Sequence, residues 1–277
     1  MILVADSGST KTNWSVCEKG QLICQLLTSG TNPFFQTTEE ITNEIGTSLW
    51  PTLSSFQIET VYFYGAGCAF TEQTDIIREA FKPFTNVPVE VYSDLMGAAR
   101  SLCGKQSGIA CILGTGSNSC YYDGLSIRQQ ISPLGFILGD EGSGAVLGKL
   151  LVADCLKHQL PENICKKFME QYSLTPALLL DRIYKKPFPN RFLAHLSGFL
   201  LENIEEQAIY NLVYNSFRSF FIRNVMQYEG YKNCPIHFTG SIAYYYRKVL
   251  LDAASSLQLT LGKIEKEPMP GLISFHS

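Results

Sequence analysis

Residues 2–14 read ILVADSGSTKTNW and have the pattern of a β-hairpin. The apolar run from Ile2 to Ala5 has the length of a short strand, and Trp14 to Cys17 resumes as a second strand. Only small or polar residues lie between these two runs, which is typical of a turn. We therefore expect the chain to begin with two paired strands joined by a glycine-containing turn.

This turn combines the features of an anion site with a carboxylate. Asp6 ends the first strand, and Gly8 has no Cβ, so the backbone there can adopt positive φ and approach a ligand. The polar side chains around the glycine are Ser7, Ser9, Thr10, Lys11 and Thr12. Successive N–H groups in such a turn attract anions, so a neighbouring carboxylate indicates a cation between them. Mg²⁺-bound nucleotide phosphate, with Asp6 holding the metal's waters, fits this pattern; an ordinary polar turn is the alternative.

The composition is that of a globular protein. The 277 residues are 45% hydrophobic and 17% charged, which permits a substantial core and argues against disorder. The net charge of −3 gives no support for nucleic-acid binding. No apolar stretch reaches the length of a membrane span, and no basic leader precedes Asp6. We expect a cytoplasmic protein that binds neither nucleic acid nor membrane.

The nine cysteines and four histidines are scattered along the chain and form no zinc-type spacing. We expect reduced, largely buried thiols and no metal site built on these residues.

The first hundred residues predict the order β-β-β-α-β-α-β-α, and the pattern then starts again. Ile109 to Leu113 is an apolar run, and a small polar turn follows over residues 114–119. Setting Gly116 against Gly8 aligns the two turns, so the chain contains an internal repeat of about half its length. We expect a first lobe over residues 1–104 and a second over residues 105–277.

The second lobe has an insertion that the first one lacks. Residues 158–230 read as mainly helical and have no counterpart in the first half. Ile236 to Thr239 is then a strand, and Gly240-Ser241 opens a helix. We expect the last strand at Leu257 to Leu261, followed by a short tail from Pro268.

Three common enzyme motifs are absent from the sequence. There is no P-loop sequence for a nucleotide. The Gly114-x-Gly116 pair continues into a strand instead of a helix, which excludes a dinucleotide fold. No G-x-S-x-G elbow of a serine hydrolase occurs either.

Several segments together resemble the N-acetylglucosamine kinase and BadF/BadG-type ATPase family, within the sugar kinase, heat-shock chaperone and actin superfamily. They occur in the family's order and span nearly the whole chain: residues 6–12 (DSGSTKT), 92–94 (YSD), 113–118 (LGTGSN), 135–143 with a GDEGS core, and 238–241 (FTGS). The resemblance implies an α/β fold with two ribonuclease H-like (actin-like) lobes. Each lobe has a mixed β-sheet flanked by helices, with a cleft between the lobes and a helical insertion in the second.

The resemblance also implies that Asp94 is the catalytic base and contacts the substrate. It follows a predicted strand and opens a helix. An ordinary aspartate has a pKa of about 3.9, so it is ionised at neutral pH and can accept a hydroxyl proton. Without the resemblance, a simple helix N-cap would be the better interpretation of Asp94.

The remaining site residues are carried over in the same way. The sugar-contacting positions are Thr10, Asn32, Ser117 and Asp140. For the nucleotide, the resemblance implies Thr115, Gly116, Gly240 and Ser241. The chemistry of the first turn itself adds Gly8, Ser9, Thr10, Lys11 and Thr12, with Asp6 at the metal. One departure concerns the sugar, because Leu134 stands where many N-acetylglucosamine kinases have a tryptophan in Gly-Trp-Gly.

We therefore expect an ATP- and Mg²⁺-dependent kinase that phosphorylates N-acetylglucosamine on its 6-hydroxyl, and a homodimer. Glucosamine and N-acetylmuramic acid are alternative substrates, which the departure at Leu134 leaves open. A BadF-type ATPase that activates a dehydratase would need clustered cysteines for an iron–sulfur cluster, and the cysteines are scattered. A regulatory protein that binds sugar and nucleotide is a further alternative.

Overall fold

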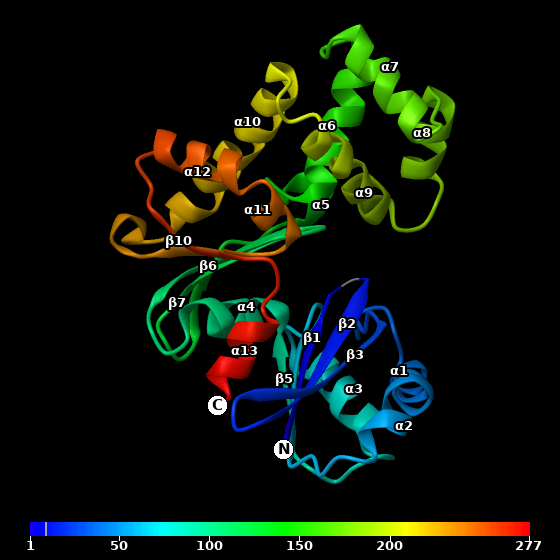
Figure 1. Cartoon of the computed structure of the whole chain (residues 1–277), viewed down its shortest axis with the longest axis vertical. Coiled ribbons are helices and arrows are strands. Elements are labelled where there is room, and N and C mark those ends of the chain that lie inside the picture. The colour runs from blue at the N-terminus through cyan, green and yellow to red at the C-terminus, as the bar shows by residue number, and fades with distance from the viewer. Residues whose placement is uncertain (9) are drawn as a thin grey trace. The chain divides into compact units, whose positions relative to one another are not determined.

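The computed structural model describes residues 1–8 and 10–277, and the chain divides into two compact units (Figure 1). Unit 1 contains Met1–Gln106, Tyr122–Ile127 and Glu267–Ser277, and unit 2 contains Ser107–Tyr121 and Arg128–Lys266. The first division lies close to the boundary that we expected after residue 104. Residues Tyr122–Ile127 and Glu267–Ser277 also belong to unit 1, whereas the sequence-based expectation places every residue beyond 104 in the second lobe.

Unit 1 is built on a five-stranded sheet with strand order β3-β2-β1-β4-β5. Its elements are β1 (Ile2–Ser7), β2 (Lys11–Glu18), β3 (Gln21–Ser29), α1 (Thr38–Glu44), the π-helix η1 (Ile45–Leu49), α2 (Trp50–Leu53), β4 (Thr60–Gly65), α3 (Thr71–Phe81), β5 (Val89–Ser93), α4 (Asp94–Cys103) and α13 (Met269–Phe275). Strand β2 is antiparallel to both β1 and β3, whereas β4 is parallel to β1 and β5 is parallel to β4. Strands β1, β3, β4 and β5 therefore run in one direction, and their carboxyl ends lie along one edge of the sheet.

Side-chain alternation along the strands of unit 1 produces two hydrophobic layers. Leu3 and Ala5 of β1 face one layer, in which the sheet packs against α1, η1, α2 and α3. Val4 faces the other, with Tyr64 of β4 and with Met269 and Leu272 of α13. Helix α13 also packs against α4, so the carboxyl-terminal residues complete the core of the unit that contains the amino terminus (Figure 1).

Unit 2 repeats the sheet topology of unit 1. Its elements are β6 (Gly108–Leu113), β7 (Ser117–Tyr122), β8 (Ile127–Gln130), α5 (Gly135–Leu138), α6 (Gly144–Leu156), α7 (Glu162–Gln171), α8 (Pro176–Tyr184), α9 (Pro189–Glu202), α10 (Gln207–Arg223), the 3₁₀ turns η2 (Val225–Gln227) and η3 (Tyr231–Asn233), β9 (Ile236–Thr239), α11 (Ser241–Tyr245), α12 (Arg247–Ser256) and β10 (Leu261–Glu265). The strand order β10-β9-β6-β7-β8 is the order of unit 1 with each strand replaced by its counterpart. This confirms the internal repeat and the two actin-like sheets, and it confirms that the added segment is helical.

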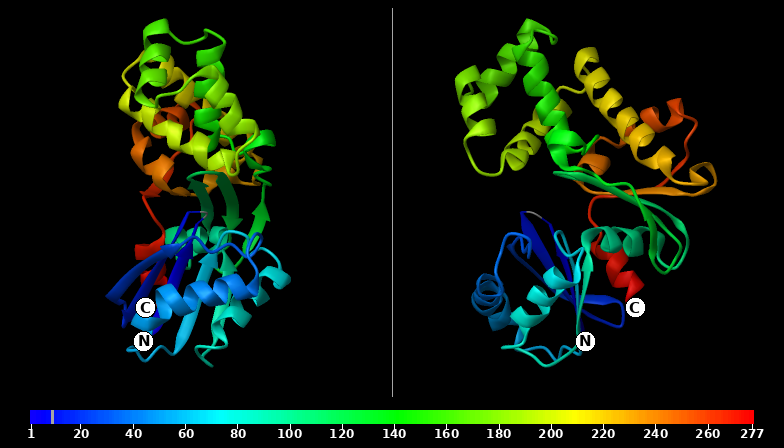
Figure 2. Two further views of the ribbon diagram at one scale, coloured as in Figure 1. Left: turned by 90° about the vertical axis from the view of Figure 1, so that its right-hand side faces the viewer. Right: turned by 180° about the vertical axis from the view of Figure 1, so that it is seen from behind.

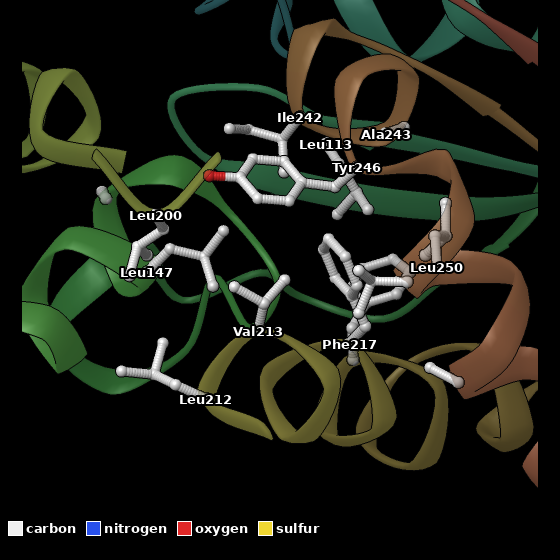
Figure 3. Close-up of a cluster of buried hydrophobic side chains, with 14 of the residues drawn as sticks. Leu113, Leu147, Leu200, Leu212, Val213, Phe217, Ile242, Ala243, Tyr246 and Leu250 are labelled. Atoms are coloured by element: carbon white, nitrogen blue, oxygen red, sulfur yellow. The ribbon is translucent and has the colours of Figure 1, made fainter. Parts of the chain in front are cut away.

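One hydrophobic core joins the helices of unit 2 to its sheet. Figure 3 shows part of this core, where Leu113 of β6 meets side chains of α6, α9, α10, α11 and α12. The labelled residues are Leu113, Leu147, Leu200, Leu212, Val213, Phe217, Ile242, Ala243, Tyr246 and Leu250. Figure 2 shows the same helical layer from two further sides. Leu113 and Ile242 directly neighbour the turns at residues 114–116 and 240–241, so this core holds both turns in place.

The carboxyl-terminal region differs from the sequence-based prediction in two ways. The last strand is β10 at Leu261–Glu265, not Leu257 to Leu261, because α12 continues to Ser256 and Gln258 then turns with a positive φ of 59°. The short tail from Pro268, for which no helix was expected, forms α13. This helix has seven residues, too few to show a clear apolar period, and it gains its stability from packing against unit 1.

Among residues 1–8 and 10–277, none of the helices has the combination of length and apolar character that a bilayer crossing requires.

The contact between α6 and α9 generates a stability prediction. A Cβ on Gly148 would lie 1.9 Å from the carbonyl oxygen of Leu193, so Gly148→Ala must push the two helices apart. We expect the free energy of unfolding to fall by about 3 kcal/mol, the upper part of the range for overpacking. Urea unfolding measures this change.

Gly198→Ala in α9 is the matched control. A Cβ there would meet only the Tyr172 hydroxyl at 3.5 Å, an ordinary contact. Because alanine favours the helix over glycine, this variant should be as stable as the parent or more stable. Equal stability of the two variants would contradict the close approach of α6 and α9.

Candidate active site

Two carboxylates of unit 1 share the edge where its parallel strands end. Asp6 lies near the end of β1, and Asp94 is the first residue of α4, directly after β5. Burial raises the pKa of Asp6 from 3.8 to about 7, and the charges of Asp94 and Glu267 raise it further, while Lys11 lowers it. The edge therefore holds negative charge that the folded protein does not itself neutralise, which favours a cation there.

Asp94 is not the N-cap of its helix. Ser93 occupies that position, and its Oγ accepts a hydrogen bond from the Met96 N–H at 3.2 Å. The Asp94 Oδ1 accepts from the Leu95 N–H at 2.8 Å, which fixes the carboxylate at the start of α4. Burial raises the pKa of Asp94, and the backbone hydrogen bonds oppose this increase. Since Ser93 already caps the helix, the N-cap interpretation does not explain Asp94.

Hydrogen bonds between residues on its two sides stabilise the turn between β1 and β2. The Gly8 N–H donates to the Lys11 carbonyl at 3.0 Å, which closes the turn. Thr12, which the turn chemistry predicts at the nucleotide, is fully buried, and its hydroxyl lies 2.7 Å from the Ser7 Oγ. Its side chain therefore connects the strands, whereas Thr10 and Lys11 are exposed. The predicted nucleotide residue Ser9 lies outside the described residues.

Asn32 lies in the loop that follows β3, at the same edge of the sheet. Its Oδ1 accepts a hydrogen bond from the Phe34 N–H at 2.9 Å, and its own N–H donates to the Gln36 Oε1 at 2.7 Å. A Cβ on Gly67 would lie 2.1 Å from the Asn32 Oδ1, so the loop after β4 contacts this amide directly. Burial and, to a smaller extent, the charge of Asp94 raise the pKa of Cys68 to about 12. Cys68 follows Gly67 in the loop after β4, so this loop lies close to Asp94.

In unit 2, the turn at residues 114–116 is oriented by the start of α6. The N–H groups of Gly144 and Ala145 donate to the carbonyl oxygens of Gly114 and Thr115 at 2.8 and 3.0 Å. Within the described part of the chain, the N–H groups of Thr115 and Gly116 have no hydrogen-bond acceptor. Two free donors on a fixed glycine turn are suited to bind an anion such as phosphate.

Asp140 lies beside this turn. Its Oδ1 accepts a hydrogen bond from the Ser117 N–H at 3.2 Å, and a Cβ on Gly116 would lie 3.2 Å from its Oδ2. Asp140 is buried and has a positive φ of 54°, and burial raises its pKa. By contrast, the neighbouring Glu141 forms an ion pair with Arg223. Only Asp140 is thus held against the glycine turn.

Gly240 is brought to the same part of unit 2 by β9. Its φ is 117°, and a Cβ there would lie 2.3 Å from the Leu113 carbonyl oxygen, so only glycine fits. Ser241 follows as an exposed residue at the start of α11. The structure therefore gathers Thr115, Gly116 and Gly240 around the end of β6, close to Asp140.

The donor set fits Mg²⁺ only together with a phosphate ligand. In residues 1–8 and 10–277, no group of three or more histidine, cysteine or acidic side chains is arranged to hold a metal. Mg²⁺ in nucleotide sites keeps several waters and uses one or two carboxylates plus the phosphates. Asp6 can supply such a carboxylate, with a charge that burial and its acidic neighbours make costly in the absence of a cation.

Comparison with solved structures identifies the family. A proposed N-acetylglucosamine kinase from Porphyromonas gingivalis is 47% identical in sequence, with a TM-score of 0.95 over 100% of this chain and 98% of that chain. The chain belongs to the N-acetylglucosamine kinase and BadF/BadG-type ATPase family. This confirms the resemblance on which the site residues were selected.

More distant structures share the fold of this kinase family. A proposed N-acetylglucosamine kinase from Chromobacterium violaceum matches with 14% identity and a TM-score of 0.77, over 100% of this chain and 99% of that one. A ROK family glucokinase from Streptomyces griseus, solved with glucose and AMPPNP, matches with 14% identity and a TM-score of 0.59, over 99% and 97%. A comparison with protein-family models and a search of curated proteins each found no match.

Sequence reasoning missed two features of the site in this family member. Glu267 contributes charge at Asp6, although it is exposed and far away in the chain, and no motif in the sequence marks it. Gly67 permits the contact with Asn32 through a positive φ of 82°. The Gly-Ala-Gly run at residues 65–67 marked this loop in the sequence but did not reveal its partner.

The raised pKa of Asp6 predicts how stability depends on pH. Because the folded-state pKa is about 7, above the ordinary 3.8, the stabilising contribution of the proton is complete below pH 3.8 and is lost as the pH rises to about 7. Asp6→Asn removes the charge, so it should stabilise the ligand-free protein more at pH 8 than at pH 5. Urea unfolding in a chelating buffer at both values measures the difference.

Asp75→Asn is the control, because Asp75 is an exposed residue of α3. It should have a similar, small effect at both pH values. An Asp6→Asn effect that does not change with pH would contradict the burial of a costly charge at this edge.

Proposed function

We propose that this chain is an ATP- and Mg²⁺-dependent amino-sugar kinase that transfers the γ-phosphoryl group to the 6-hydroxyl of N-acetylglucosamine. Family membership supports a sugar kinase, and the Porphyromonas gingivalis relative carries this activity in its name. The observation that carries the proposal is the placement of Asp94. Its carboxylate is fixed at the start of α4 and lies near Asp6 at the end of β1.

Asp94 acts as the general base. Its carboxylate accepts the proton of the sugar hydroxyl as the bond to phosphorus forms, and the bond to the leaving oxygen of ADP breaks. A carboxylate whose pKa is raised by burial is a stronger base than an exposed one. The Leu95 N–H keeps one oxygen occupied, which orients the carboxylate.

Asp6 is the residue that would hold the magnesium ion that accompanies ATP. When bound, Mg²⁺ supplies positive charge that stabilises the phosphates during transfer. Lys11 and the turn that begins at Gly8 add donors for phosphate oxygens.

Unit 2 provides the remaining nucleotide contacts in this proposal. The unpaired N–H groups of Thr115 and Gly116 bind phosphate oxygens, and Gly240 with Ser241 contacts the adenosine. Ser117 and Asp140, together with Thr10 and Asn32 of unit 1, position the sugar. A buried carboxylate such as Asp140 is suited to accept a hydrogen bond from a sugar hydroxyl.

Leu134 makes the identity of the amino sugar an experimental question. It is 58% exposed and offers no aromatic ring. Glucosamine and N-acetylmuramic acid should therefore be tested beside N-acetylglucosamine.

A coupled ADP-release assay with this panel, ATP and Mg²⁺ tests the function. We expect turnover with N-acetylglucosamine to exceed turnover with the other sugars, and a sugar 6-phosphate as the product by mass spectrometry. A preference for another amino sugar would replace the substrate while keeping the reaction. ADP release that does not depend on any sugar would reject the kinase assignment.

Asp94→Asn tests the base directly. We expect kcat to fall by roughly 10²–10⁴-fold, the range for removal of a general base, with the KM of the sugar changed by only a few-fold. The amide keeps the shape of the side chain but cannot accept the proton. Steady-state kinetics measure both parameters.

Asp75→Asn, an exposed carboxylate on α3 of the same unit, should leave kcat unchanged. If Asp94→Asn retained a kcat near that of the parent, Asp94 would have no part in proton transfer.

A further inference from the structure

The loop after β3 exposes two phenyl rings next to Asn32. Phe34 is 65% exposed and Phe35 is 74% exposed, and their ring centroids are 5.2 Å apart in an edge-to-face arrangement. Large apolar side chains that remain in water beside a functional residue often mark a binding surface. Neither ring is needed for the hydrophobic core of unit 1, which does not include them.

Hydrogen bonds within the loop hold its irregular backbone in a defined conformation. The Asn32 carbonyl accepts hydrogen bonds from the N–H groups of Phe35 and Gln36 at 3.0 and 3.1 Å. The Asn32 Oδ1 accepts from the Phe34 N–H at 2.9 Å. Thr37 and Glu40 then form a capping box at the start of α1. The phenyl rings are therefore placed in advance, and binding would not have to order this part of the chain.

Phe34 contacts a loop of unit 1 whose next residue lies close to Asp94. A Cβ on Gly67 would lie 3.3 Å from the Phe34 Cβ, so Phe34 rests on the loop after β4. Cys68, the next residue of that loop, is close enough to Asp94 to sense its charge. The three atoms nearest to a Cβ on Gly67 belong to Asn32 and Phe34.

Asn32 adds a polar group to this surface. Its Oδ1 is used within the loop, but its Nδ2 has no acceptor among the residues that the structure describes. A pyranose ring combines hydroxyl groups around its rim with an apolar face of C–H groups. An aromatic ring beside a free amide donor matches both parts of such a molecule.

We propose that Phe34 forms a platform for the C–H face of the sugar, beside the amide of Asn32. This inference rests on the proposed sugar kinase function. It identifies Phe34 as a residue that determines the affinity for the sugar. The platform supplies an aromatic surface that Leu134 cannot provide.

Substitutions at Phe34 test the platform. Phe34→Ala should raise the KM of N-acetylglucosamine about tenfold, while kcat and the KM of ATP stay near the parent values. Phe34→Leu keeps an apolar side chain but loses the flat ring, so it should resemble Phe34→Ala. Phe34→Tyr retains the ring and should preserve the affinity. Thermal unfolding should be nearly unchanged in all three, because the side chain is mostly exposed.

Phe35→Ala is the matched control. Phe35 is an exposed residue of the same type in the same loop, but the atoms nearest to a Cβ on Gly67 belong to Asn32 and Phe34. It should change the KM of the sugar much less than Phe34→Ala does. Equal effects of the two variants would overturn the assignment to Phe34.

A calorimetric titration with N-acetylglucosamine in the absence of ATP separates the inference from the proposed function. We expect sugar affinity to fall about tenfold in Phe34→Ala, as in the kinetics. If the parent phosphorylates the sugar and Phe34→Ala keeps the parent's KM and affinity, the platform is rejected and the kinase assignment remains. If the parent neither binds nor phosphorylates any sugar of the panel, both proposals are rejected.

Discussion

The direction of four strands in unit 1 is the constraint on which its functional residues depend. Strands β1, β3, β4 and β5 run the same way, so Asp6, Asn32, the glycine loop at residues 65–67 and Asp94 all arrive at one edge of the sheet. Two antiparallel pairings, β1 with β2 and β2 with β3, return β3 to this direction. A slip by one residue in β1 would turn Asp6 to the opposite face of the sheet. Leu3 and Ala5 lie in one hydrophobic layer and Val4 lies in the other. Because a slip would move each of these apolar side chains to the wrong face, the two layers oppose it.

Unit 2 uses a second constraint, the approach of backbone to backbone without intervening side chains. Gly240 lies against the Leu113 carbonyl, and the first N–H groups of α6 bond to the carbonyls of Gly114 and Thr115. These contacts occupy the carbonyl oxygens of Gly114 and Thr115, while the N–H groups of Thr115 and Gly116 have no acceptor among the described residues. The helical insertion supplies much of the hydrophobic core that includes Leu113, so its packing holds the adjoining turn in place. A site made of backbone groups requires this support, because it has few side chains that could adjust to an error.

The site carries groups that lower stability. Burial and like charge make the carboxylate of Asp6 costly to ionise, and Phe34 and Phe35 remain exposed to water. Such conflicts with the rest of the fold are expected where function and stability have different requirements. The apolar cores of the two units, which contain no comparable conflict, maintain the fold around these residues.

Local sequence determined the strands, the glycine turns and the internal repeat, because strand alternation and turn chemistry depend on neighbouring residues. Turn chemistry indicated Asp6, and the family resemblance, which similarity over the full chain confirms, selected Asp94 and Asp140. Only the tertiary structure decided that Ser93 caps α4, that the Thr12 hydroxyl is buried, and that Glu267 acts on Asp6. It also placed α13 on unit 1 and Phe34 on the loop at Gly67. Each of these contacts joins segments that are distant in the chain or depends on where a side chain points after folding. No local pattern encodes them, and they become defined only when the sheets and helices pack.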